Sequence, residues 1–571
     1  MKKVLIYYDI DSKKLFNKLK VDYKIYNNQK NITELVIKNL NFYKFKNSKK
    51  IFLDSYRSIK NRSRFFAYLL KFAKFNTDIN ISGINVFDAS KYHILARYEK
   101  YFYNIDLVEK ISKFKNSKII WFYTSNYFFD NNYYKKIKFL SNSYNLNIEF
   151  IKIDDSIFYR KIISYVYRKL LVFLTFLSIN LTFSFLRKEI IPKTKILIFE
   201  YFKNSFKLHK NLNFNQKSKV TYLNYNSVTY SNYKKNNFTS FLCQRIFFFE
   251  DIFNIFKVKQ KIKDKLNKKN NLEIIKKYDA FNYVIAENSH LILLEICTTK
   301  NTINYYLNQV NPKFIISSTF SSIFGFVLSE TAKQKKIKNF YIPHGNNNYA
   351  KYNSYINYDN VIVWSEHDKK KLEKNYRKKI SILGPHIFQN LIDFRNKKII
   401  NKKSKIICYF PSRTAGYVVN QYESLEILDA YLELAKAHPN FTFLIKKHPQ
   451  DSFNLEEYVE KFNLSNVRFT KITESNLSIL KKVNIVIVSS STVVFEAAIL
   501  NKIIIIYQIR ENNYLNIDTI DSFHFVKNRK TLIKTFDYLN FDYNKNFNFH
   551  KKFINNRLNG LKIINLESLL K

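Results

Sequence analysis

The sequence predicts an α/β protein with parallel sheets. Short runs rich in β-branched and aromatic residues alternate with longer, charged, helix-like stretches along almost the whole chain, which is typical of α/β domains. The chain has 571 residues, more than one hydrophobic core usually serves, so we expect two or three domains. Its hydrophobic fraction of 46% is too high for a disordered protein.

The predicted strands fall into three groups. An apolar segment separates the first group from the second, and the polar, basic stretch Asn396–Ser404 separates the second from the third. In chain order the strands are VLIYYDI, KIIWFYT and NIEFIKI; then KILIFEY, KVTYLNY, NYVIAE, KFIISS, NFYIPH and NVIVWS; then KIICYFP, FTFLIK, NIVIVSS and KIIIIYQ. The grouping predicts an N-terminal α/β region at 1–155, a basic and apolar helical segment at 156–194, α/β domains at 195–395 and 404–545, and a helical tail at 546–571.

The formal net charge is +51. The lysines accompany asparagine, isoleucine, phenylalanine and tyrosine, residues encoded by A- and T-rich codons, so base composition explains much of the excess. Because the lysines are spread along the chain and not gathered in one arm, we expect no specific nucleic-acid partner. Attraction to an anionic membrane surface needs no such clustering and is the expected consequence of the charge.

Cellular location is predicted from the cysteines and the apolar segments. The three scattered cysteines form neither a disulfide framework nor a zinc module, which favours a reducing cytoplasm. The apolar stretch after Met1 is too short for a signal peptide. Leu170–Leu186 carries no charge but falls short of the roughly 20 residues that span a bilayer. A buried or interfacial helix and a membrane span both stay open for this segment.

Glycine and proline mark the predicted site. Three of the six glycines and five of the seven prolines lie between residues 343 and 449. Most of them follow a predicted strand, where they indicate loops with special backbone angles. Because ligands of open α/β sheets bind at the carboxyl ends of the strands, we expect the ligand site in this region.

The run NIVIVSSSTVVFEAAIL predicts a buried strand, a tight turn and a helix that opens near Ser491 or Thr492. A helix N-terminus attracts phosphate through its unpaired amides. Ser489, Ser490, Ser491 and Thr492 supply hydroxyl donors at the same place, so the run predicts a phosphate site. Helix capping alone, which needs one hydroxyl, is the alternative.

Three further residues complete the predicted nucleotide site, where we expect His448 and the serines to converge on one phosphate from adjacent strand ends. His448 stands at the end of FTFLIKK, where Pro449 stops the strand and the imidazole can donate to a phosphate. Arg413, in the loop PSRTAG, can grip a phosphate with its planar guanidinium. Glu496 lies one turn into the predicted helix, where it can accept from ribose hydroxyls or complement the helix dipole. His448 and Arg413 can equally be solvated turn residues.

The general base is predicted less sharply. NYVIAENSH presents Glu287 and His290, and NFYIPHG presents His344; any of these can deprotonate an acceptor hydroxyl, and each can also be a loop residue or a cap. The sequence has no GxxxxGK[ST], GxGxxG, HExxH or EF-hand motif, which argues against a P-loop NTPase, a dinucleotide oxidoreductase and a zincin. We predict neither a metal site nor a cofactor.

Taken together, His448-Pro449 at one strand end and the serines that lead into the helix of Glu496-Ala-Ala resemble motifs of the GT-B glycosyltransferases of bacterial capsule and lipopolysaccharide assembly. Among these are capsule polysialyltransferases, Kdo transferases and CDP-glycerol glycerophosphotransferases. YIPHG, YDNVIVWSEHDKKKLEK and ISILGPHIF resemble the segment that joins the two domains of such enzymes. The resemblance covers about 195 to 545 and implies a GT-B-like pair of Rossmann-type domains with an additional N-terminal α/β region.

The resemblance also implies roles. His448, Ser490 and Ser491 would contact the donor phosphate, Glu496 the ribose, and the middle domain a glycan or lipid-linked glycan acceptor. The reaction would be direct displacement at the anomeric carbon without an essential metal. The acidic pair followed by glycine that marks the polysialyltransferase base is not found in this sequence.

These features predict a glycosyltransferase that moves a sugar from a nucleotide-activated donor, linked to CMP, CDP or UDP, to a growing surface polysaccharide. It would be cytoplasmic and peripheral at the inner face of the cytoplasmic membrane. The alternatives are a CDP-glycerol-type polyol-phosphate transferase, a nucleotide-sugar epimerase of the same fold and a non-catalytic scaffold subunit.

Overall fold

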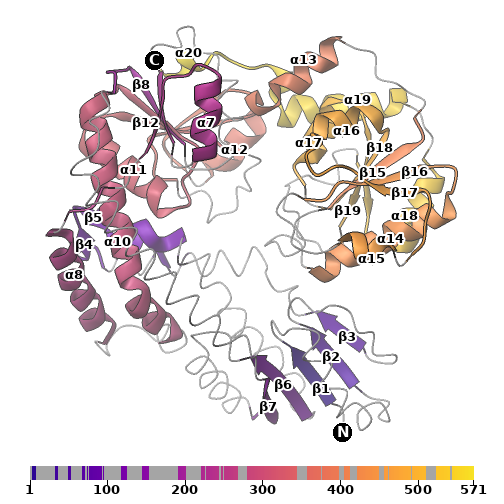
Figure 1. Ribbon diagram of the computed structural model, residues 1–571, viewed down its shortest axis with the longest axis horizontal. Coiled ribbons are helices and arrows are strands. Elements are labelled where there is room, and N and C mark those ends of the chain that lie inside the picture. Colours follow the sequence, from indigo (N-terminus) through magenta and orange to yellow (C-terminus); the bar gives the residue numbers. More distant parts are fainter. Residues whose placement is uncertain are drawn as a thin grey trace.

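The computed structural model in Figure 1 contains three parallel sheets, and helices pack against the two larger ones. It describes residues 3–7, 32–36, 49–52, 67, 69–70, 74, 76–92, 94, 118–124, 145–153, 191–200, 220–224, 227–243, 246–248, 250–267, 279–343, 356–374, 376–397, 404–411, 421–448, 455–460, 462–489, 491–508, 523–539 and 543–570. Within these residues, no helix has the length and hydropathy that a membrane span requires. Leu170–Leu186 lies outside them.

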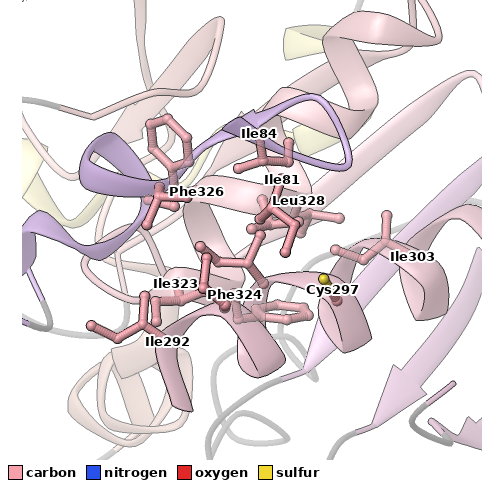
Figure 2. Close-up of a cluster of buried hydrophobic side chains, with 14 of the residues drawn as sticks. Ile81, Ile84, Ile292, Cys297, Ile303, Ile323, Phe324, Phe326 and Leu328 are labelled. Carbon is pink, nitrogen blue, oxygen red and sulfur yellow. The ribbon is translucent and has the colours of Figure 1, made fainter. Parts of the chain in front are cut away.

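The N-terminal sheet has the order β3-β2-β1-β6-β7, and all its strand pairs are parallel. Its strands are β1 (Lys3–Tyr7), β2 (Ile32–Val36), β3 (Lys49–Phe52), β6 (Lys118–Thr124) and β7 (Ile148–Ile153). A small antiparallel hairpin of β4 (Asn80–Ile81) and β5 (Ile84–Asn85) packs apart from this sheet, against α8 (Glu250–Asn267) and α10 (Asp279–Val310). Figure 2 shows its Ile81 and Ile84 in the same apolar cluster as Phe326 and Leu328 of α11 (Ile323–Gln334).

The middle sheet has the order β10-β9-β8-β11-β12-β13-β14 and is parallel throughout. Its strands are β8 (Ile196–Glu200), β9 (Val220–Asn224), β10 (Ser240–Leu242), β11 (Phe314–Ser317), β12 (Lys338–Tyr341), β13 (Asn360–Val363) and β14 (Lys379–Ile382). Its helices are α7 (Ser227–Lys235), α8 (Glu250–Asn267), α10 (Asp279–Val310), α11 (Ile323–Gln334) and α12 (Glu366–Glu373), followed by η5 (His386–Phe388) and α13 (Gln389–Lys397).

The C-terminal sheet has the order β17-β16-β15-β18-β19-β20 and is also parallel. Its strands are β15 (Ile406–Phe410), β16 (Thr442–Ile445), β17 (Val467–Phe469), β18 (Ile485–Val488), β19 (Ile503–Tyr507) and β20 (His524–Val526). Its helices are α14 (Gln421–Ala437), α15 (Leu455–Glu460), α16 (Asn476–Lys482), α17 (Val493–Ile499) and α18 (Arg529–Asp537).

Strand order confirms the predicted α/β class. In all three sheets the first strand is central, the second and third follow on one side, and the fourth lies on the other side. This 3-2-1-4 order is that of Rossmann-type folds, and the two larger sheets form the predicted pair of such domains. Every residue of β18 and of β19 is buried, as expected for strands covered by helices on both faces.

One predicted strand is wrong. NYVIAE lies inside α10, a helix of 32 residues. A short apolar run does not distinguish a buried strand from part of a buried helix by periodicity. Here the run continues into HLILLEIC, whose apolar residues pack along α10 in the core of the middle domain, as Ile292, Ile296 and Cys297 show.

The C-terminal segment connects the cores of the two larger sheets. α19 (Tyr543–Arg557) places Phe553 and Leu558 in the core of the C-terminal sheet. After η6 (Asn559–Leu561) the chain returns to the middle sheet, where the Ile564 N–H donates to the Leu383 carbonyl at 2.8 Å. α20 (Leu566–Leu569) then packs on the core of the middle sheet. The last residues of the chain therefore hold the two domains together.

Aromatic rings form a second connection. Trp364, directly after β13 of the middle sheet, belongs to the core of the C-terminal sheet. Its ring lies 5.8 Å from that of Phe495 on α17 and 5.5 Å from that of Phe388. Phe495 also lies 5.5 Å from Phe553 of α19. α17, which follows the serine run, is thus fixed by contacts with both domains.

We expect Gly384→Ala to be strongly destabilising. Gly384 has a φ of +92°, and a Cβ built there would lie 2.0 Å from the Lys562 carbonyl oxygen of the returning chain. The left-handed backbone and the backbone clash together should lower the free energy of unfolding by about 3 kcal/mol or more. Urea denaturation measures the loss. Gly560→Ala is the matched control, because its φ is +59° but its nearest neighbour is a side-chain atom at 3.4 Å, so it should cost only about 1 kcal/mol. Equal losses for the two variants would contradict the close approach at Gly384.

We also expect Asp368 to give stability a distinctive pH dependence. Asp368 of α12 is buried; burial raises the pKa of its carboxyl from 3.8 to about 6, against the opposing charge of Arg557. Between these values the folded protein holds a proton that the unfolded chain has released, so stability falls as the pH rises through 6. The free energy of unfolding of the protein minus that of Asp368→Asn should drop by about 3 kcal/mol between about pH 3 and about pH 7. Urea denaturation of both proteins across this range measures the difference, and a difference that does not change with pH would show that Asp368 titrates normally.

Candidate functional site

The candidate site lies at the carboxyl edge of the C-terminal sheet. β15 is paired with β16 on one side and with β18 on the other, so the connections after β15 and β18 leave the sheet in opposite directions. A crevice that binds ligands is expected at such a switch point. Pro411 follows β15 and Ser489 follows β18 at this edge.

The serine run leads from β18 into α17, as predicted. Ser489 is buried, Ser491 is half-buried and Thr492 is exposed. The Ser491 hydroxyl accepts from the Val493 N–H at 3.3 Å, whereas Thr492, the N-cap residue, makes no capping bond with its side chain. Local capping therefore accounts for one hydroxyl of the run. Ser490 lies outside the described residues.

Glu496 is half-buried in α17, whose Phe495 packs on Trp364. Its carboxylate accepts from the Asn476 side-chain amide at 3.0 Å, at the start of α16. This bond orients Glu496 toward the start of α16. The contact with ribose that the resemblance implies is not tested by these contacts and remains a prediction.

His448 lies just beyond the end of β16 and is half-buried. The two residues before it are lysines with defined partners. The buried Lys446 ammonium donates to the carbonyls of Lys471 at 3.1 Å and Ile472 at 2.8 Å, and burial lowers its pKa. Lys447 pairs with Glu456 of α15 at 2.7 Å. Sequence reasoning missed Lys446 and Lys447, although a pair of lysines directly before His448 is visible in the sequence.

The prediction that His448 and the serines follow adjacent strands is wrong. β16 and β18 are not adjacent, because β15 lies between them. Two strand spacings, about 10 Å, therefore separate the backbones that carry the two motifs. They face the same edge from either side of β15, so a ligand that contacts both must extend over the end of β15. Arg413, in the loop after β15, lies outside the described residues.

Two of the candidate bases lie in a helix and not after a strand. Glu287 and His290 lie in α10, and about 30 Å of helix separates His290 from Val310 near the start of β11. β11 has only four residues, about 13 Å, so this part of α10 extends beyond the sheet. The expectation that Glu287 and His290 follow a strand is therefore wrong. His344 and the side chain of Glu287 are outside the described residues, and His290 is half-buried.

The middle sheet has a polar switch point of its own, which sequence reasoning missed in part. β8 and β11 are adjacent, and Glu200 ends β8 while Ser317 ends β11. Glu200 is fully buried and accepts from the Tyr233 hydroxyl of α7 at 2.5 Å. Burial, together with the Glu200 carboxylate, raises the pKa of Tyr233 well above its usual value. Ser317 belongs to the predicted FIISSTFSS, but Glu200 carried no signal beyond its place at the end of a strand.

The part of the chain that the structure describes contains no group of three or more histidine, cysteine, aspartate or glutamate residues placed to hold a metal ion.

No protein-family model matches the sequence. No curated protein matches it either. Among solved structures, a UDP-GlcNAc 2-epimerase from Neisseria meningitidis bound to UDP-GlcNAc is 14% identical, with a TM-score of 0.44 over 66% of this chain and 98% of its own. A glycosyltransferase from Rickettsia africae is 14% identical, with a TM-score of 0.40 over 66% of this chain and 97% of its own. The wall teichoic acid polymerase TagF, soaked with CDPG, is 12% identical, with a TM-score of 0.37 over 67% and 89%. Likenesses of this degree assign no activity, and the fold rests on the strand orders above.

Proposed function

We propose that this protein is a GT-B-type glycosyltransferase that binds a nucleotide-activated sugar at the carboxyl edge of its C-terminal sheet. The observation that carries the proposal is the arrangement around β15. His448 on one side and the hydroxyls of Ser489 and Ser491 on the other flank the switch point of a 3-2-1-4-5-6 parallel sheet. Such an edge suits an extended ligand with phosphate near its centre.

The donor phosphates would lie over the end of β15, between His448 and the serine hydroxyls. Hydroxyl and imidazole donors suit phosphate oxygens, and the loop of Arg413 starts at the same edge. The ammonium of Lys446, held two residues before His448, adds positive charge to this end of the sheet. Glu496 would accept hydrogen bonds from the ribose hydroxyls. The Asn476 side chain donates to one of its carboxylate oxygens and holds the side chain in place.

The reaction would be a single displacement. The acceptor hydroxyl oxygen forms a bond to the anomeric carbon, while the bond from that carbon to the donor phosphate oxygen breaks. The electron pair leaves with the nucleotide, and hydrogen bonds from His448 and the serines stabilise the charge that develops on its phosphate. The acceptor proton passes to a general base.

The acceptor would bind at the switch point of the middle sheet, where Glu200 and Ser317 lie. Of the three candidate bases, His344 is the one that follows a strand end, because Pro343 lies just beyond β12. We therefore assign the base to His344. The acceptor class is a growing surface glycan, free or linked to lipid, and the site of action is the inner face of the cytoplasmic membrane.

The proposal predicts nucleotide binding that depends on His448. A ligand at about 100 times its dissociation constant stabilises a protein by about 2.7 kcal/mol, so one of CMP, CDP, UDP and GDP should raise the melting temperature of the full chain clearly. His448→Ala should lose most of this rise. The matched control is His438→Ala, which removes another histidine before proline, at the opposite end of β16, and should keep the full rise. Thermal shift with each nucleotide measures both variants.

The nucleotide that binds would also indicate the donor class. A rise with CMP favours a Kdo- or sialic-type donor, a rise with CDP a polyol-phosphate donor, and a rise with UDP a hexose donor. If His448→Ala retains the rise, the phosphate site is elsewhere. If no nucleotide raises the melting temperature, the scaffold alternative replaces the transferase.

The proposal also predicts that His344 acts on the acceptor and not on the donor. His344→Gln should slow sugar transfer about 10²- to 10⁴-fold while leaving the nucleotide-induced thermal shift unchanged. Release of nucleotide from the matching nucleotide sugar, with and without extracted surface polysaccharide, measures the rate. A transfer rate equal to that of the parent would remove His344 from this role, and a free, epimerised sugar nucleotide as product would identify an epimerase.

A further inference from the structure

The start of α8 carries an unusually exposed aromatic surface. Phe248 is 56% exposed, Phe253 is 68% exposed and Phe256 is 65% exposed, all within nine residues of chain. Scattered exposed apolar side chains are common, but contiguous ones mark interaction sites. We call Phe248, Phe253 and Phe256, with Lys257 and Lys261, the α8 surface.

Packing of the opposite face of α8 fixes this exposure. Ile255, Val258 and Ile262 are buried in the core that α8 shares with α10. At the first turn, Asp251 accepts from the Asn301 side chain at 2.6 Å and from the Phe248 N–H at 3.1 Å. Because α8 is held on this side, Phe253 and Phe256, one turn apart, must face away from α10.

Lysines accompany the phenylalanines on the solvent side. Lys257 follows Phe253 by four residues and lies next to Phe256, Lys261 continues the same side one turn later, and both are exposed. Lys263 lies on the opposite side of the phenylalanine pair from Lys257, and it is also exposed. The helix is fixed and apolar at its start. Its exposed side carries three lysines against two acidic residues, Glu250 and Asp264, so it is basic on balance.

We propose that the α8 surface binds the surface of an anionic lipid bilayer. Phenylalanine rings at the start of α8 would enter the boundary between headgroups and acyl chains, while the lysines contact anionic headgroups. The charge of the surface and its apolar content both match this partner. The inference does not depend on the proposed transferase activity; if both hold, it brings the middle domain, and with it the proposed acceptor site, to a lipid-linked acceptor.

A second copy of the chain is a poorer fit. In a two-fold interface the same patch meets itself, so Lys257 and Lys261 of each copy would face lysines of the other. A nucleic acid would also be attracted by the lysines, and it is separated from a bilayer by the test below.

The test is sedimentation of the full chain with vesicles of phosphatidylcholine, with and without phosphatidylglycerol. We expect binding to the anionic vesicles only. Phe253→Ser with Phe256→Ser should lower the partition coefficient about tenfold or more. Lys257→Gln and Lys261→Gln should each lower it about fivefold, and less at high salt.

The matched control replaces an aromatic and lysine pair elsewhere. Tyr538 is 76% exposed, and the Lys534 ammonium lies 5.9 Å from its ring. Tyr538→Ser with Lys534→Gln should leave vesicle binding unchanged. For all these surface variants the melting temperature should stay close to that of the parent, which distinguishes loss of lipid binding from unfolding. Their nucleotide-induced thermal shifts should persist, which distinguishes it from failure of the proposed function.

Three results would overturn the inference. One is binding to anionic vesicles that survives the phenylalanine changes, and another is no binding to them at low salt. The third is full competition between a single-stranded oligonucleotide and the vesicles for binding to the parent, together with loss of oligonucleotide binding in the phenylalanine variant. That result would assign the α8 surface to nucleic acid.

Discussion

The close passage of the C-terminal chain against Gly384 is the contact on which the arrangement of the two larger domains depends. The Lys562 carbonyl approaches Gly384 where no side chain fits, and the next turn of chain is hydrogen-bonded to Leu383. From there α20 reaches the core of the middle sheet, while α19 remains in the core of the C-terminal sheet. One continuous segment is thus part of two cores, and a change in the relative position of the sheets must strain it.

The same junction reaches the candidate site. Phe495 of α17 packs between Trp364 of the middle domain and Phe553 of α19, and Glu496 is the next residue. α13, which connects the two sheets, adds a bond from Arg395 to the Ile499 carbonyl at the end of α17, at 3.0 Å. Contacts from both domains therefore set the position of Glu496, the residue proposed to bind the ribose. Movement of one domain on the other would be transmitted to this helix through its aromatic side chain.

The two switch points differ in chemistry. At the C-terminal sheet the edge presents hydroxyls, an imidazole and a lysine held by carbonyls, a set that suits an anion. At the middle sheet the strand end holds a buried carboxylate bonded to a tyrosine hydroxyl, a set that does not suit an anion. This difference is the physical basis for assigning donor and acceptor to separate domains. The exposed phenylalanines of α8 belong to the second of these domains.

Much of the fold is determined by the sequence alone. Runs such as IVIV and IIIIY consist almost entirely of β-branched apolar residues, which favours a strand covered on both faces. Ile485 to Glu496 likewise encode a strand, a turn and a helix in their order. The edge strands β10, β17 and β20, each of three residues and less completely buried, carried no such signal. NYVIAE carried a misleading strand signal, because its apolar residues can equally belong to a long helix.

Strand order was decided only by the tertiary structure. Nothing local to FTFLIKKH or NIVIVSSS states that β15 lies between them, because the order follows from how the crossover helices cover both faces of the sheet. Position 384 needs glycine because of a chain segment almost 180 residues later. Glu200 likewise finds its hydrogen-bond partner on a distant element, α7. Local sequence determines which segments are strands and which groups end them. Burial between elements distant in sequence determines which of those groups meet.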